Sequence, residues 1–128
     1  MKILLIEVKK LKSHEEINQK HLEKLKRRIL IDGKIKNPVI VEKNSLTILD
    51  GHHRVQVVRL LKLKKIPAHL VNYTDPKIRV LPRRKNIKVS KAIVLFRAKS
   101  GNKFPVKTTR HIIPKRPLSC NIPLKFLT

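Results

Sequence analysis

The sequence predicts an α/β (α+β) fold: a small mixed sheet with flanking helices, followed by a short C-terminal helix and a wrapping tail. Three observations support this prediction. Short β-branched runs alternate with stretches of helical periodicity. The length of 128 residues suits one domain with at most a short appended lobe. Prolines recur after residue 104, so that the end of the chain cannot form a regular helix.

A strand and a long helix are expected first. Residues 4–8, apolar except for Glu7, predict the strand. The helix that follows begins at one of two caps, Ser13 or Asn18, because apolar residues recur at helical spacing after both. It runs to about Ile31 and ends at Gly33, which supplies a left-handed terminus.

A hairpin, a second helix and a third segment of sheet follow. Residues 38–41 and 46–49 predict the two strands of the hairpin, joined by a turn at residues 43–45. Residues 66–71 predict a further strand. The second helix lies between them and turns three apolar side chains inward: Val55, Val58 and Leu61.

The pattern changes after residue 73, which divides the chain into residues 1–73 and a C-terminal lobe of residues 74–128 that packs on the same domain. Residues 81–86 predict a basic connector. Residues 89–99 predict a helix that ends at Gly101 and has three residues on its apolar side: Ala92, Ile93 and Phe96. The proline-rich tail holds enough apolar residues to wrap against the body of the domain.

The net charge of +24 is extreme for this length and points to an anionic partner. Lysines that neutralise phosphates favour non-specific nucleic-acid binding. The charge, however, is spread along the chain, and aromatic residues for base stacking are scarce, at 3%. A small anionic substrate such as a nucleotide would also be drawn to this field. Charge alone leaves both partners open.

Cellular location is inferred from cysteine and hydropathy. The chain has one cysteine, Cys120, which excludes a disulfide within one chain and fits a reducing compartment. The apolar start, residues 1–6, is too short for a signal peptide, and no stretch reaches membrane-spanning length. We expect a cytoplasmic protein with no membrane partner.

The run Asp50-Gly51-His52-His53-Arg54, at the start of the second helix, predicts an anion site. Glycine allows close approach of a ligand, and the first N–H groups of a helix lack intrahelical partners. The helix dipole and the basic side chains favour phosphate. An aspartate there suggests a metal ion or chemistry, and therefore phosphoryl transfer. The alternative is an ordinary acid–glycine turn followed by a solvated arginine.

A second group lies in the tail. If residues 107–111 are extended, then Lys107, Thr109 and His111 project from one face, which suits a carboxylate or a phosphate ester. The alternative is a basic edge strand with solvated side chains. Among the eight acids, Glu15 and Glu16 precede the first helix, where they could serve the cap and dipole or accept a proton from a substrate hydroxyl.

Residues 7–73 resemble the ParB/sulfiredoxin superfamily, on the segments 22–33, 38–41 and the helix-opening Asp50-Gly51. Sulfiredoxin chemistry is excluded, because the position of its cysteine is occupied by His52. Asp-Gly-His-His-Arg is instead similar to the archaeal free L-serine kinases, as are the tail segments 104–111 and 121–124. The resemblance implies a magnesium-dependent kinase that phosphorylates serine with ADP or ATP, giving O-phospho-L-serine for cysteine biosynthesis.

The resemblance also implies roles for individual residues. Glu15 matches the general base, and Asp50 matches a second catalytic acid that helps to organise magnesium or the attacking hydroxyl. The transferring phosphates would be held by the helix-opening residues Gly51, His52, His53 and Arg54. The serine end would be held by Lys107, Thr109 and His111.

Three functions therefore stay open: a free serine kinase, a ParB-like nucleic-acid-binding module, and a relative that only binds nucleotide. The choice of ADP or ATP and the oligomeric state are not determined by the sequence. The kinase hypothesis requires that residues 50–54 and 107–111 share a single pocket.

Overall fold

A four-stranded mixed sheet organises the computed structural model, which describes residues 3–117 and 119–128. The strands lie in the order β1 (Leu4–Glu7), β5 (Lys65–Val71), β3 (Val39–Glu42) and β4 (Ile48–Asp50). β3 pairs with β5 in parallel, while β1–β5 and β3–β4 are antiparallel. The predicted α/β fold with a small mixed sheet is confirmed. Residues 1–2 of the predicted first segment, and residue 118 of the tail, lie outside the described residues.

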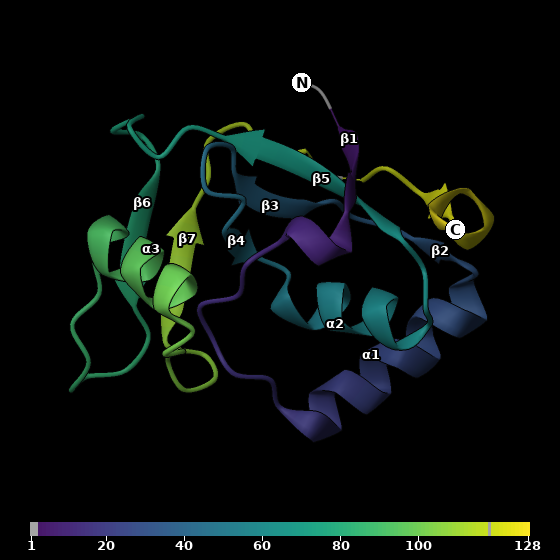
Figure 1. The fold of residues 1–128 in the computed structure, drawn as a ribbon, viewed down its shortest axis with the longest axis horizontal. Coiled ribbons are helices and arrows are strands. Elements are labelled where there is room, and N and C mark those ends of the chain that lie inside the picture. Colours follow the sequence, from purple (N-terminus) through teal and green to yellow (C-terminus); the bar gives the residue numbers. More distant parts are fainter. Residues whose placement is uncertain (1–2, 118) are drawn as a thin grey trace.

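Two helices pack together on one side of this sheet (Figure 1). α1 (Gln19–Asp32) is capped by Asn18, whose side chain accepts a hydrogen bond from the His21 N–H at 2.9 Å. Ser13 is therefore the wrong cap. The segment before Asn18 stays extended because Glu15 forms a bridge with Phe104 of the tail. α1 ends at Gly33 in the left-handed conformation (φ 67°), as predicted.

The second helix, α2 (His52–Leu60), follows β4 directly. Val55 and Val58 are buried as expected, and Val57 is buried as well. Leu61, the C-cap residue of the helix, is half-buried. The hairpin returns at Ile48 rather than at Leu46, because Leu46 takes a left-handed backbone (φ 57°) in the turn.

A second small sheet forms in the C-terminal part of the chain. β6 (Arg79–Pro82) pairs antiparallel with β7 (Thr109–Ile112), about 30 residues further along the chain. The predicted connector at residues 81–86 is therefore partly wrong, since its first two residues belong to β6. Proline at a strand end and arginine at its start hid the strand in the sequence, and only the distant partner stabilises it.

Helix α3 (Lys91–Ser100) lies where the sequence predicts it but turns a different face inward. Ser90 caps it by accepting from the Ile93 N–H at 3.1 Å, and Gly101 ends it at φ 78°. Val94 and Ala98 are buried, one turn apart, whereas Phe96 is 65% exposed. The predicted apolar side with Ala92 and Phe96 is wrong, because the helix rests on its Val94–Ala98 edge.

The tail wraps against the body of the domain, as expected. β8 (Ile122–Pro123) pairs with β2 (Lys34–Ile35), and a 3₁₀ turn at Leu124–Leu127 follows. Leu127 is completely buried, and its carbonyl accepts a hydrogen bond from the Lys64 N–H at 2.8 Å. Among the described residues, no helix is long and apolar enough to cross a membrane.

The core consists of two hydrophobic clusters on opposite sides of β3. Successive side chains of β3 point to opposite faces of the sheet, which explains this division. Val39 and Val41 belong to the cluster under α1 and α2, and Ile40 belongs to the other cluster. All four residues of β3 are buried. The second cluster joins Leu49 and Tyr73 to Val94 and Phe104 and therefore spans residue 73. The predicted division into residues 1–73 and 74–128 stays a prediction.

The second cluster allows the effect of a core mutation on the free energy of unfolding to be predicted. Phe104 is 1% exposed and packs there, so we expect Phe104→Ala to lower the free energy of unfolding by about 3–5 kcal/mol. Phe96→Ala removes the same side chain from an exposed position and is expected to change it by less than about 0.5 kcal/mol. Urea unfolding followed by circular dichroism measures both, and equal effects would contradict the assignment of the core.

Candidate functional site

A cavity of about 470 Å³ is lined by residues from both predicted motifs. The turn at residues 50–54 forms one wall, and Glu15, Lys107 and Thr109 contribute from other segments. His111 does not line this cavity. It lines a smaller one of about 290 Å³, which shares Asp50 and Thr109 with the first. The structure thus brings every predicted site residue except His111 to one cavity, and places His111 next to it.

The turn into α2 depends on Gly51. Its φ of 108° is in the left-handed region, and a Cβ there would lie 2.4 Å from Cγ1 of Val39. No larger residue therefore fits without displacing β3. The tight turn lets α2 begin at once, with the N–H groups of its first turn at the cavity wall.

The Arg54 side chain is bound to the backbone around the turn and holds it in place. Its Nη1 donates to the carbonyls of Asn37 and Pro38 at 2.8 and 3.0 Å, and its Nη2 lies 3.8 Å from Oδ2 of Asp50. The guanidinium therefore ties the loop before β3 to the end of β4. It supplies positive charge to the site from a fixed position.

His52 and His53 hold the segment before α1 against α2. Nε2 of His52 accepts from the His14 N–H at 3.2 Å, and Nε2 of His53 accepts from the Asn18 N–H at 3.1 Å. Both rings must be neutral to accept. Burial, with a smaller effect of His14, lowers the pKa of His52 to about 3, and burial also lowers that of His53. These histidines therefore contribute hydrogen-bonding groups to the site and no net charge.

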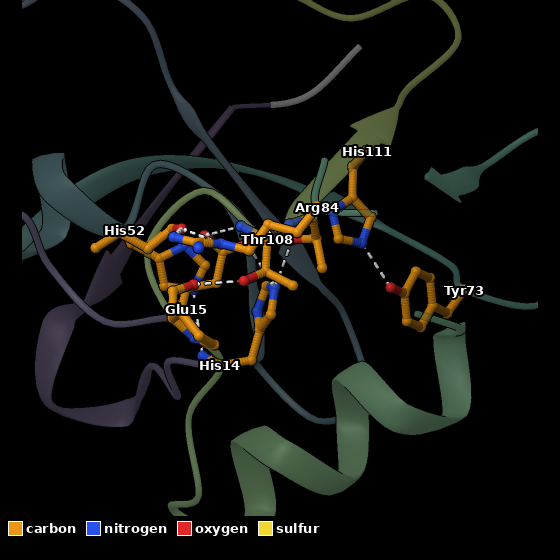
Figure 2. A network of polar contacts seen from close by, with 10 residues as sticks. His14, Glu15, His52, Tyr73, Arg84, Thr108 and His111 are labelled. Carbon is orange, nitrogen blue, oxygen red and sulfur yellow. Dashed lines mark hydrogen bonds and ion pairs between the residues drawn. The ribbon is translucent and has the colours of Figure 1, made fainter. Parts of the chain in front are cut away.

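Glu15 is a buried, ionised carboxylate bonded to Thr109, the first residue of β7, and to Thr108 before it. Its Oε2 accepts from both the backbone N–H (2.9 Å) and the hydroxyl of Thr109, and its Oε1 lies 3.4 Å from the Thr108 N–H (Figure 2). Burial by itself raises the pKa of Glu15, but the adjacent His14 ring and the hydrogen bonds from Thr109 outweigh this effect and lower the pKa to about 2. Glu15 does not cap α1, which begins at Asn18.

His14 is a site residue that the sequence analysis missed. Its ring is fully buried, with Nε2 3.0 Å from the Thr109 hydroxyl oxygen and 3.6 Å from Oε2 of Glu15. Because that hydroxyl donates to Glu15, it must accept from Nε2 of His14, which assigns the proton to Nε2. No periodicity marks His14, because it lies in an irregular segment.

Asp50 is held by two arginines at the mouth of the cavity. Its Oδ2 accepts a hydrogen bond from Arg116 and lies 3.8 Å from Nη2 of Arg54. Burial by itself raises the pKa of Asp50. The hydrogen bond and charge of Arg116, together with the charge of Arg54, have the larger effect, so that the pKa lies below its ordinary value. Arg116, which comes from the irregular tail, is the second site residue that the sequence analysis missed.

The tail motif is only partly extended. Lys107 has a left-handed backbone (φ 53°) in a turn, so the prediction that Lys107, Thr109 and His111 share one strand face is wrong for Lys107. The strand begins at Thr109, and there Thr109 and His111 do share a buried face. Lys107 still lines the larger cavity from the turn.

His111 forms a buried pair with Tyr73 (Figure 2). Its Nε2 lies 2.6 Å from the Tyr73 hydroxyl, and the rings are stacked with centroids 5.8 Å apart. Burial, with a smaller effect of His14, lowers the pKa of His111 to about 4, and burial raises the pKa of Tyr73. The hydroxyl is therefore the donor and the neutral ring the acceptor.

The cavity offers few protein side chains that could bind a metal ion. In the described parts of the chain, no three acidic, histidine or cysteine side chains converge on a point. The oxygens of Glu15 are occupied by Thr108 and Thr109, whereas Asp50 is partly exposed. Mg²⁺ is commonly held by one or two carboxylates together with substrate phosphates. The partly exposed carboxylate of Asp50 would therefore fit an ion that is held mainly by phosphates.

The neutral histidines predict a pH-dependent stability. An unfolded histidine has a pKa near 6.5. His52 and His111 hold much lower values when folded, so the unfolded chain binds more protons below pH 6.5. The free energy of unfolding should fall as the pH drops from 6.5 toward 4, by up to about 1.4 kcal/mol per pH unit for each histidine.

Urea unfolding at pH 7.5 and pH 5 measures this effect. His111→Gln is expected to lose less stability between these pH values than the natural chain. An unchanged pH dependence in His111→Gln would contradict the assignment of a neutral buried ring.

The chain is similar in sequence to ParB-related proteins. Residues 1–87 match the ParB N-terminal domain family. Over 81 residues, the chain is 36% identical to an ATP-dependent L-serine kinase of Staphylothermus marinus, covering 60% of this chain and 32% of that protein. It is 30% identical to an ADP-dependent L-serine kinase of Thermococcus kodakarensis over 81 residues, covering 60% of this chain and 34% of that protein. The chain spans about a third of the length of these curated relatives.

Solved structures share the whole fold at low sequence identity. A conserved hypothetical protein from Pyrococcus furiosus superposes with a TM-score of 0.91 at 18% identity, over 100% of this chain and 98% of that one. A free serine kinase in complex with AMP gives 0.87 at 17% identity, over 98% and 93%. These likenesses show the fold, and the match over residues 1–87 establishes that the chain belongs to the ParB N-terminal domain family.

Proposed function

We propose that this chain is a free L-serine kinase that transfers a phosphoryl group from ADP or ATP to the serine hydroxyl and yields O-phospho-L-serine. The observation that carries the proposal is the juxtaposition, in one cavity, of an ionised Glu15 and the N-terminus of α2. An acceptor for a hydroxyl proton and a cradle for phosphate are what this reaction requires. The two curated relatives named L-serine kinase support it.

The phosphates of the donor would lie at the start of α2. The N–H groups there and the ring N–H groups of His52 and His53 are hydrogen-bond donors, and the helix dipole favours the anion. Lys107 and Arg54 supply the positive charge that the neutral histidines lack. Phosphoryl transfer depends mainly on positioning and charge compensation, which these groups provide.

The serine hydroxyl would lie at Glu15. A carboxylate with a pKa near 2 is a weak base, but it accepts a hydrogen bond at every physiological pH. In a loose transition state the hydroxyl loses its proton late, so Glu15 mainly orients the attacking oxygen and receives the proton as the new bond forms. Thr109, which holds Glu15, and His14 behind it keep this carboxylate in place.

Asp50 would bind the magnesium ion of the nucleotide complex. Bound there, Mg²⁺ would neutralise charge on the phosphates that flank the transferred group. Arg116 and Arg54 keep Asp50 ionised for this role. O-phosphoserine made in this way would serve cysteine biosynthesis, and we place the reaction in the cytoplasm of an archaeon.

Nucleic-acid binding in the manner of a ParB-like module is the second candidate, favoured by the net charge of +24. Incubating the protein with serine, magnesium and either ADP or ATP distinguishes the two functions. Phosphoserine formation supports the kinase and identifies the donor. DNA binding that weakens steeply with salt, in the absence of phosphoserine, supports the second candidate.

Replacing Glu15 tests the proposed acceptor of the hydroxyl. Glu15→Gln keeps the shape and the hydrogen-bond capacity of one oxygen but removes the charge, so we expect phosphoserine formation to fall by roughly 10²–10⁴-fold. Nucleotide affinity should be unchanged. The control is Glu23→Gln, an exposed glutamate of α1, which should retain full turnover. Turnover of Glu15→Gln within twofold of the natural chain would exclude the role.

Replacing Asp50 tests the magnesium assignment without turnover. Calorimetry of ADP binding, with and without Mg²⁺, should show that the ion strengthens binding to the natural chain. In Asp50→Asn this enhancement should be lost, while ADP alone binds at least as well because a negative charge has been removed. An enhancement equal to that of the natural chain would assign the ion to other ligands.

A further inference from the structure

The smaller cavity, next to the one already described, is rich in arginine and has no role in the mechanism so far. It measures about 290 Å³. Three arginines line it: Arg83, which directly follows β6, Arg110 of β7 and Arg116 of the tail. Asp50 is the one acid among its lining residues, and Arg116 already pairs with it. The cavity therefore carries an excess of positive charge that no described side chain neutralises.

The two cavities are neighbours that share part of their lining. Leu49, Asp50, Arg83 and Thr109 line both. Glu15 lines only the larger cavity, and Arg116 only the smaller. A molecule whose hydroxyl lies at Glu15 beside Thr109 can therefore extend past Thr109 into the arginine-lined space. The larger cavity, at about 470 Å³, is left for the bulkier nucleotide.

Arg116 is able to accept a second anion. Only its Nη2 is used by Asp50, so the other N–H groups of the planar guanidinium remain as donors. Arg83 has its backbone N–H bonded to Thr108, but its guanidinium forms no ion pair with the described residues. Arginine pairs with carboxylates in planar, two-point geometry. Arg84, by contrast, is already engaged with the Val106 carbonyl.

We propose that Arg83 and Arg116 bind the carboxylate of the acceptor, so that the smaller cavity selects a hydroxy acid over a simple alcohol. The inference rests on the proposed kinase function and assigns it a specificity determinant outside both sequence motifs. Arg116 would also link the larger and the smaller cavity, because one edge of its guanidinium donates to Asp50 and the other edge would bind the acceptor.

Two ligands that differ only in the carboxylate test this assignment: O-phospho-L-serine and phosphoethanolamine. Calorimetry measures the affinity of each for the natural chain, Arg83→Gln, Arg116→Gln and Lys115→Gln. Lys115 is an exposed neighbour that lines neither cavity, so its variant reproduces the change in net charge alone. Circular dichroism verifies that each variant is folded.

We expect each arginine variant to weaken phosphoserine binding by roughly tenfold or more, as for the loss of a charge-assisted pair. Phosphoethanolamine should bind Arg83→Gln within about twofold of the natural chain. In Arg116→Gln, where Asp50 also loses its partner, phosphoethanolamine should weaken several-fold less than phosphoserine. Lys115→Gln should leave both ligands unaffected. Equal weakening of both ligands, or of neither, would overturn the assignment, as would failure of the natural chain to prefer phosphoserine.

Turnover of the natural chain separates this inference from the function on which it rests. If phosphoserine forms and the KM for serine is the same in both arginine variants, only the carboxylate assignment fails. If no phosphoserine forms with either nucleotide, the kinase proposal itself fails.

Discussion

The site depends on the bond between the Glu15 carboxylate and the backbone at the start of β7. Glu15 lies in an extended segment near the N-terminus, and Thr109 lies more than 90 residues later. The Thr109 N–H and hydroxyl both donate to the same carboxylate oxygen, and the Glu16 N–H bonds to the Phe104 carbonyl beside them. A buried charge is tolerated only when it is paired or hydrogen-bonded in this way. The same contact joins the N-terminal segment to the tail and fixes Glu15 in the cavity that the start of α2 also lines.

The histidines of the Asp50–Arg54 turn extend this arrangement. Each accepts a hydrogen bond from the segment that carries Glu15, His52 from His14 and His53 from Asn18. Their pKa values are lowered mainly by burial, so they stay neutral and rigid at physiological pH. Positive charge at the site comes instead from arginine, which stays protonated even when buried, and from the exposed Lys107. Position and charge are thus supplied by different side chains.

The two cavities suggest how a small domain can hold two anionic ligands. They meet at Asp50 and Thr109, residues contributed by β4 of the first sheet and β7 of the second. Asp50 stands between cations that come from separate parts of the chain, Arg54 of α2 and Arg116 of the tail. An acid in this position limits the repulsion among the surrounding cations and allows each ligand a separate region of positive charge.

The sequence by itself determined the local features. Gly33 ends a helix, Gly51 permits the turn that exposes the N–H groups of α2, and the Asp50–Arg54 run predicts an anion site, because these effects act within a few residues; the choice of Asn18 over Ser13 as the cap came from the structure. The fold class followed from the same patterns. Only the tertiary structure decided the rest. β6 exists because β7 pairs with it, α3 rests on Val94 because of the cluster around Phe104, and His14 and Arg116 reach the site from irregular segments. Such contacts leave no periodicity in the sequence, since the partners are far apart along the chain and are chosen by packing and charge in the folded state.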